Sequence, residues 1–178
     1  MNLPNRLTLL RMAMVPLYVA LLLIDFPFHT LAALAVFILA SLTDLLDGHI
    51  ARSRNLITDF GKFMDPLADK ILVLSAMICF CQLGVMPAWA VIVVIFREFA
   101  VSGMRLVAVE GGRVIAAGWS GKIKTAATMV CLCLMHLPIP APADVIVNWA
   151  CVIVIVATTL YSGVEYFVKN RDVFKGSM

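Results

Sequence analysis

Charged residues are scarce in this chain. Of its 178 residues only 14% are charged, whereas 62% are hydrophobic and the mean hydropathy is +0.99. Soluble domains carry roughly 25% charged residues, so the chain lacks both the polar surface of a water-soluble globule and the polarity of a disordered segment. The formal net charge of +3 gives no support for a nucleic-acid partner. The composition predicts an integral membrane protein with a single domain, residues 1–178.

Cysteine spacings that bind metals or form disulfide frameworks are also missing. No C-x-x-C occurs, and all five cysteines lie within apolar runs: Cys79, Cys81, Cys131, Cys133 and Cys151. Free cysteine is among the most buried residue types. We therefore interpret these residues as apolar filler.

Six apolar stretches are candidates to cross a bilayer, which takes about 20 mostly apolar residues. We expect transmembrane helices at residues 7–24, 30–51, 67–83, 87–109, 121–137 and 145–168. Lysine and arginine are absent from the connections at residues 25–30, 82–87 and 137–144. Basic residues mark the cytoplasmic side of a membrane protein. The sequence therefore predicts an all-α integral membrane fold with six transmembrane helices and both termini in the cytoplasm.

Four aspartates lie at the ends of two of these stretches. Asp44 and Asp47 are three residues apart in the second stretch, and Asp65 and Asp69 are four apart at the start of the third. On helices these spacings place side chains on one face, so two helices could aim four carboxylates at one point. Mg²⁺ or Mn²⁺ would relieve their repulsion and suits hard oxygen ligands. Individually, each aspartate could instead pair with a nearby base, and Asp65 could cap a helix.

Small and phosphate-binding residues are interleaved with these aspartates. Gly48, Ala51 and Gly61 leave room for a bulky ligand, although small residues also allow close helix packing in membranes. Arg52 and Thr58 supply a guanidinium group and a hydroxyl group suited to phosphate oxygens. The combination points to phosphoryl chemistry on a diphosphate at the cytoplasmic interface.

Two arginines lie in the fourth stretch, Arg97 near its middle and Arg105 two turns later. Their directions differ by about 80° at 100° per residue, so both can face one cavity. Lys122 and Lys124, at the start of the fifth stretch, could join them. Alternatively, Arg97 pairs with Glu98, Arg105 contacts lipid phosphate, and the two lysines only mark the cytoplasmic side.

Residues 44–69 read D-x2-D-G-x2-A-R-x8-G-x3-D-x3-D without a departure. This motif resembles the signature of the CDP-alcohol phosphotransferase family, whose members are six-helix membrane enzymes and commonly homodimers. Further segments resemble the bacterial branch of that family that makes phosphatidylglycerophosphate: L-P-N-R-L-T-L-L-R, D-P-L-A-D-K, R-E-F-A-V-S-G-M-R-L-V-A, W-S-G-K-I-K-T and Y-S-G-V-E-Y-F-V-K-N.

The resemblance implies a reaction and assigns roles to these residues. A phosphatidyl group would pass from CDP-diacylglycerol to glycerol 3-phosphate, releasing CMP, in phospholipid biosynthesis among the lipids of a bacterial inner membrane. The expected ligands of two Mg²⁺ or Mn²⁺ ions are Asp44, Asp47, Asp65 and Asp69, with Asp69 also the general base. The expected cytidine diphosphate pocket consists of Asn5, Thr8, Gly48, Ala51, Arg52, Thr58 and Gly61. Asn5 and Thr8 could equally cap a helix. The acceptor of this reaction carries a phosphate, and its expected ligands are Arg97, Arg105, Lys122 and Lys124.

Other functions remain open at this point. Another acceptor, such as inositol phosphate or serine, would keep the same fold and metal site. A divalent-cation transporter would explain the aspartates but not Arg52 or the glycines, and it would need polar residues toward the outer face, where the stretches are nearly uniformly apolar. A purely structural membrane subunit would leave the aspartates unexplained.

Overall fold

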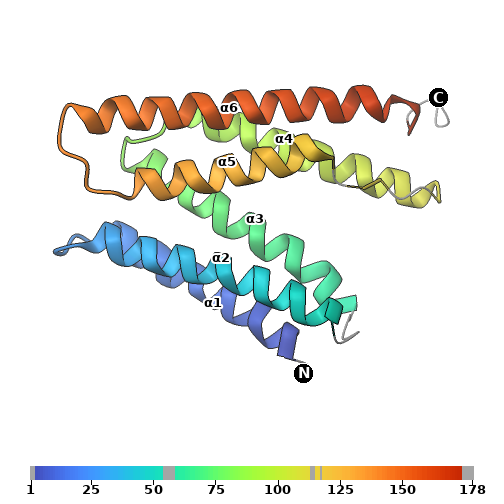
Figure 1. The fold of residues 1–178 in the computed structure, drawn as a ribbon, viewed down its shortest axis with the longest axis horizontal. Helices are drawn as coiled ribbons and strands as arrows, with labels where there is room; N and C mark the ends of the chain where they lie inside the picture. Colours follow the sequence, from blue (N-terminus) through green and yellow to red (C-terminus); the bar gives the residue numbers. More distant parts are fainter. Residues whose placement is uncertain (1–2, 54–58, 113–114, 117, 174–178) are drawn as a thin grey trace. The chain divides into compact units, whose positions relative to one another are not determined.

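The computed structural model shows an all-helical chain (Figure 1). Its description covers the backbone of residues 3–53, 59–112, 115–116 and 118–173, and the side chains of these residues except 3–5, 44–53, 59–63, 65–66 and 173. This described part contains no strand and forms six α-helices and a short 3₁₀ helix: α1 Leu3–Leu23, α2 His29–Ser53, α3 Asp59–Gln82, α4 Ala88–Glu110, α5 Trp119–Met135, α6 Ala143–Lys169 and η1 Arg171–Val173.

The six predicted helices are found, and most of their ends lie within two residues of the predicted ones. Two starts differ more: α1 begins at Leu3 rather than residue 7, and α3 begins at Asp59 rather than residue 67. The predicted limits followed the apolar side chains, whereas the backbone hydrogen bonds of a helix continue through polar residues as well. The extra turns of α3 bring Gly61 and Asp65 onto the same helix as Asp69.

Two of the described helices are long and apolar enough to cross a membrane by length and composition alone. They are α1, over Arg6–Leu23, and α6, over Ala143–Lys169. The described side chains of α2 include a shorter apolar stretch, His29–Thr43. Of the other helices, α4 carries four charged residues along its length, and α5 has only 17 residues. The charged residues within α4 lower the hydropathy that would mark this helix as a membrane span.

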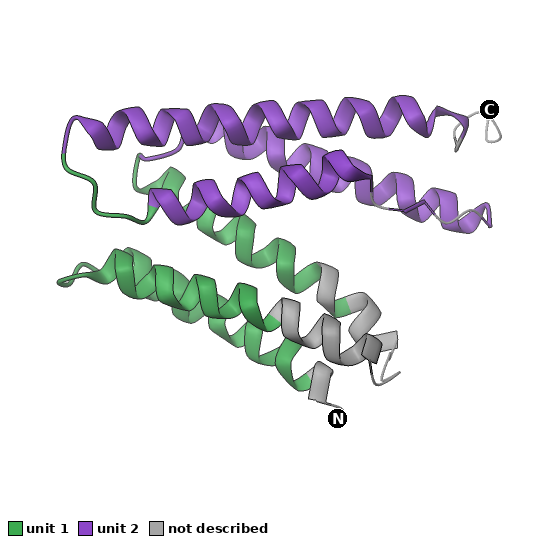
Figure 2. Cartoon of the chain, in the orientation of Figure 1, with its two compact units in different colours: residues 1–84, 136–140 green, residues 85–135, 141–178 purple. Residues whose placement is uncertain are grey.

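The chain divides into two compact units (Figure 2). Unit 1 comprises residues 1–84 and 136–140, and unit 2 comprises residues 85–135 and 141–178. Within unit 1, α1 packs against α2 and α3; within unit 2, α6 packs against α4 and α5. Each unit has its own set of buried residues.

An aromatic cluster fills part of the core of unit 1. His136, from the segment after α5, is 1% exposed, and its Nε2 lies 3.0 Å from the hydroxyl of Tyr18. The rings of Phe37 and Phe80 lie 5.7 Å and 4.8 Å from the imidazole, centroid to centroid. This contact fixes the segment after α5 to the three helices of unit 1.

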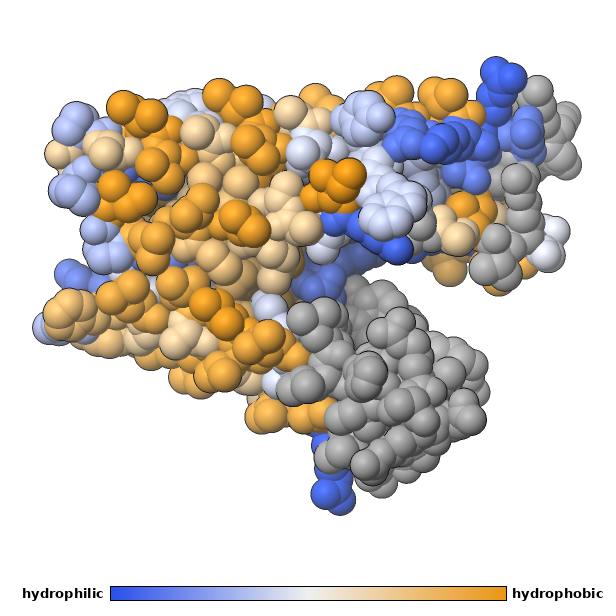
Figure 3. All heavy atoms as spheres, in the orientation of Figure 1, coloured by the Kyte–Doolittle hydropathy of each residue, from blue (hydrophilic) through white to orange (hydrophobic). Residues whose placement is uncertain are grey.

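The outer surface of unit 2 is strongly apolar. Phe96, Phe99 and Ile146 are among its exposed side chains. On the face drawn in Figure 3, hydrophobic residues cover most of the length of its helices, and hydrophilic residues gather near the C-terminal end of α6. Exposed apolar surface of this kind is suited to lipid rather than to water.

Candidate active site

The four aspartates of the motif lie on two helices of unit 1. Asp44 and Asp47 lie in the last third of α2, and Asp65 and Asp69 lie in the first half of α3. The side chains of Asp44, Asp47 and Asp65 lie outside the described residues, whereas that of Asp69 is partly buried and interacts with another group of the protein. The helical assignment confirms the secondary structure that the spacing argument needs.

Of the seven residues of the predicted cytidine diphosphate pocket, the structure describes the side chain of one, Thr8. Thr8 in α1 is fully buried and makes a polar interaction within the protein. Thr58 lies outside the described residues, and so do the side chains of Asn5, Gly48, Ala51, Arg52 and Gly61. Their backbone positions place Asn5 in α1, Gly61 in α3 and the other three in α2.

Arg11 is a residue that sequence reasoning placed in the first span without giving it a role. It follows Thr8 by three residues on α1, and both side chains are 0% exposed. A fully buried guanidinium requires a polar or anionic partner, and Arg11 does interact with another group of the protein. An arginine that interrupts an apolar stretch was the signal that could have identified it.

A divalent cation fits the chemistry of the donor set in unit 1. Carboxylate oxygens are hard ligands of the kind that Mg²⁺ and Mn²⁺ prefer, and the motif supplies four carboxylate groups in two helical pairs on α2 and α3. Among the residues whose side chains are described, no group of three or more histidine, cysteine or acidic residues could hold a metal. The candidate site therefore rests on the four aspartates of the motif.

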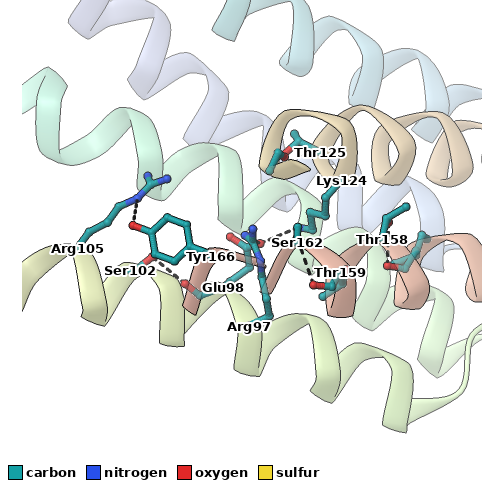
Figure 4. A network of polar contacts seen from close by, with 12 residues as sticks. Arg97, Glu98, Ser102, Arg105, Lys124, Thr125, Thr158, Thr159, Ser162 and Tyr166 are labelled. Carbon is teal, nitrogen blue, oxygen red and sulfur yellow. Dashed lines mark hydrogen bonds and ion pairs between the residues drawn. The ribbon is translucent and has the colours of Figure 1, made fainter. Parts of the chain in front are cut away.

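Unit 2 contains a cluster of buried charges around Glu98 (Figure 4). Lys124 donates from Nζ to Glu98 Oε1 at 2.6 Å, and Arg97 donates from Nη1 to the same oxygen at 3.1 Å. The side chains of all three residues are 15% exposed or less. Two cations thus share one carboxylate, which leaves the trio with a net positive charge.

Two glycines lie beside Arg97, and one of them, Gly163, is needed to make room for its side chain. A β-carbon added at Gly163 of α6 would lie 3.3 Å from Arg97 Cγ, and one added at Gly121 of α5 would lie 3.7 Å from Arg97 Nη2. The arginine side chain, which comes from α4, therefore lies against the backbones of α5 and α6. Its Nε is buried and has no hydrogen-bond partner among the described residues.

Arg105 lies on the same helix as Arg97 and contacts α6 further along. Its Nε donates to the hydroxyl of Tyr166 at 3.2 Å, and its guanidinium carbon lies 5.6 Å from the centroid of the Tyr166 ring. Gly163 and Tyr166 are three residues apart, and so they share a face of α6. That face therefore contacts both arginines (Figure 4).

The two lysines of α5 are placed differently. Lys124 is 4% exposed, whereas Lys122 is exposed and its Nζ lies 4.9 Å from the centroid of the Trp119 ring. Two residues along a helix turn the side chain through about 200°. The structure thus brings Lys124 together with Arg97 and places Lys122 on another side of α5.

The structure contains the pair of Arg97 and Glu98 that the sequence suggested as an alternative to phosphate binding. Arg97 does bind Glu98, but Glu98 also accepts a hydrogen bond from Lys124. Sequence reasoning missed the second bond and the contact between Arg105 and Tyr166, because the partners are 26 and 61 residues apart. The pairing therefore does not cancel the positive charge of the cluster.

Comparison with known proteins shows that the chain is similar to members of one enzyme family. Residues 1–161 match the family model described as CDP-alcohol phosphatidyltransferase. A relative from Bacillus subtilis (strain 168), named CDP-diacylglycerol--glycerol-3-phosphate 3-phosphatidyltransferase, is 44% identical, with 99% of this chain and 98% of the relative covered. A probable phosphatidylglycerophosphate synthase of Mycobacterium tuberculosis is 40% identical over 97% of this chain and 83% of its own length. A Pseudomonas fluorescens relative with the same name as the Bacillus protein is 35% identical, with 93% and 88% covered.

Proposed function

Since the chain belongs to the CDP-alcohol phosphatidyltransferase family, we propose that it transfers a phosphatidyl group from CDP-diacylglycerol to glycerol 3-phosphate, producing phosphatidylglycerophosphate and CMP. The observation that carries this proposal is the nearly full-length similarity to relatives named for this reaction. The eight fixed residues of the motif lie on α2 and α3, which agrees with it. The chain is an enzyme of phospholipid synthesis.

The reaction is a displacement at phosphorus. The primary hydroxyl oxygen of glycerol 3-phosphate attacks the phosphorus that carries the diacylglycerol, and the bond from that phosphorus to CMP breaks. Asp69 accepts the proton of the attacking hydroxyl, as a positioned carboxylate does in general base catalysis. CMP leaves with the electron pair of the broken bond.

The proposed metal ligands are Asp44, Asp47, Asp65 and Asp69, which would together hold two ions of Mg²⁺ or Mn²⁺. When bound, such ions polarise the phosphorus and neutralise charge on the departing CMP. The cytidine diphosphate part would lie against the seven pocket residues of α1, α2, α3 and the connection after α2: Asn5, Thr8, Gly48, Ala51, Arg52, Thr58 and Gly61.

The cation cluster of unit 2 would bind the phosphate of the acceptor. Arg97, Arg105 and Lys124 provide three positive charges around one face of α6, and Glu98 offsets one of them. A phosphorylated acceptor satisfies the remaining charge, whereas serine would not. Lys122 stays a predicted fourth ligand, although its ammonium group lies over Trp119.

We place the protein in a bacterial inner membrane, with six transmembrane helices, both termini and the active site on the cytoplasmic side, and a homodimer as the assembly. Support comes from the absence of basic residues in three alternate connections and from the exposed apolar side chains. The family match spans residues of both units. We therefore propose that residues 1–178 act as one catalytic domain.

The test is release of CMP from CDP-diacylglycerol by detergent-purified protein. The acceptors are glycerol 3-phosphate, inositol phosphate, inositol and serine, each with Mg²⁺, with Mn²⁺ or with a chelator. We expect release with glycerol 3-phosphate only, and loss of release with the chelator. Release with another acceptor would overturn the acceptor assignment. Absence of release from folded protein that binds divalent cations would instead favour a transporter.

A further inference from the structure

A polar cavity lies in unit 2 beside the cation cluster. It has a volume of about 310 Å³ and lies between the C-terminal end of α6 and the segment that leads into α5. Its polar walls come from Ser120, Glu165, Tyr166, Lys169 and Asn170. This volume is at the small end of the range for ligand pockets, and so it suits a small polar molecule.

Tyr166 connects this cavity to the cation cluster. Its ring lines the cavity, and its hydroxyl accepts the hydrogen bond from Arg105. Lys169, one turn further along α6, contributes a second cation to the cavity wall. An anionic group bound near Arg105 would therefore extend the rest of its molecule toward Glu165.

Glu165 has unused capacity to accept hydrogen bonds. Its Oε1 accepts from Lys169 Nζ, and the hydroxyl of Ser120, which lines the same cavity, also interacts with the carboxylate. Its Oε2 is shielded from solvent and has no well-aligned hydrogen-bond donor among the described residues. An ionised carboxylate offers about four acceptor positions, and a shielded oxygen without a donor is unfavourable. Because the terminal torsion of glutamate is broad, a small rotation of the carboxylate can present Oε2 to a donor in the cavity.

We propose that Glu165 determines the specificity for the acceptor by accepting a hydrogen bond from its secondary hydroxyl group. This inference rests on the proposed function. A carboxylate accepts from hydroxyl groups and repels phosphate, so the phosphate of glycerol 3-phosphate points to the cations and the glycerol part points to Glu165. The residue thereby orients the substrate and selects a polyol phosphate over a phosphate monoester that lacks the second hydroxyl.

The test compares glycerol 3-phosphate with 3-hydroxypropyl phosphate, which keeps the primary hydroxyl and the phosphate but lacks the secondary hydroxyl. For the wild type we expect kcat/KM to be about 10- to 100-fold higher with glycerol 3-phosphate, as one hydrogen bond to a charged group provides. Glu165→Leu should lower kcat/KM for glycerol 3-phosphate to the value of the analogue and leave the analogue unchanged. Glu165→Gln, which keeps one acceptor oxygen, should give an intermediate ratio.

Matched controls separate specificity from folding. Glu110→Leu replaces an exposed glutamate at the end of α4 and should keep the wild-type ratio. Persistence of the wild-type ratio in Glu165→Leu, or an equal loss with both substrates, would overturn the inference while leaving the proposed function intact. No CMP release by the wild type with glycerol 3-phosphate would overturn the proposed function, and the inference with it.

Discussion

The two units differ in charge although each contains three of the described helices. By sequence, unit 1 carries six acidic and six basic residues, whereas unit 2 carries five acidic and eight basic residues, so the whole net charge of +3 belongs to unit 2. Four of the acids of unit 1 lie in the motif on α2 and α3. In unit 2 the buried charges are two cations on one carboxylate. We therefore propose that unit 1 binds the metal and the donor and that unit 2 binds an anionic acceptor.

The units also differ in how their buried polar groups are held. His136 of unit 1 is enclosed by aromatic rings and one hydroxyl. Lys124 of unit 2 is 4% exposed and is held by the carboxylate of Glu98 (Figure 4). The first arrangement is a contact of rings and a hydroxyl group, whereas the second joins two cations to one carboxylate.

The largest effect should come from Asp69→Asn in unit 1. The amide keeps the shape of the side chain but cannot accept the proton of the hydroxyl, so kcat should fall roughly 10²- to 10⁴-fold. The rate of CMP release at saturating concentrations of both substrates measures kcat. Asp25→Asn is the control, because Asp25 is fully exposed after the end of α1. An Asp69→Asn variant that retains full kcat would remove the catalytic role from unit 1.

A paired substitution in α5 tests the role of unit 2. Lys124→Met leaves Arg97 neutralised by Glu98, and so the KM for glycerol 3-phosphate should rise roughly tenfold or more. Lys122→Met, which removes the exposed lysine over Trp119, should change KM little. Equal rises in both variants would show that the acceptor phosphate contacts both lysines, as the sequence predicted.

A smaller effect, on stability rather than on KM, is expected from Tyr18→Phe. Loss of the hydroxyl leaves Nε2 of His136 without this partner in an aromatic cluster, which should lower the free energy of unfolding by about 1–3 kcal/mol. Thermal unfolding in detergent measures the change. Tyr161→Phe, at an exposed tyrosine of α6, serves as the control and should have no effect. Equal stability of the two variants would contradict the role of the cluster.

The smallest expected effect is a difference in KM between alanine substitutions at two glycines of unit 2, Gly163 and Gly103. Gly163→Ala brings a β-carbon to 3.3 Å from Arg97 Cγ, so the arginine must shift by a few tenths of an ångström, and KM should rise roughly two- to fivefold. Gly103→Ala meets no atom within 4 Å. It should keep the wild-type KM and raise the free energy of unfolding by about 0.5–1 kcal/mol. A KM unchanged by Gly163→Ala would mean that the position of Arg97 is not critical.

The sequence predicted the helices well because apolar length and basic residues are local signals. The aspartate site stays a prediction, which could be made because a three- and a four-residue spacing define one face of a helix without reference to the rest of the fold. It could not predict that Glu98 binds Lys124 as well as Arg97, or that Arg105 contacts Tyr166, because these partners come from different helices. His136 was assigned no role for the same reason, as Tyr18 is 118 residues away.

The segment 136–140 belongs to unit 1, although the helices on either side of it belong to unit 2. The chain therefore passes from one unit to the other after residues 84, 135 and 140, and no single cut can yield two fragments that each hold a complete unit. During synthesis, Tyr18 cannot meet its histidine until the ribosome has made α5. A fragment that ends after α3 would contain all four aspartates of the motif and still lack part of the core that supports them.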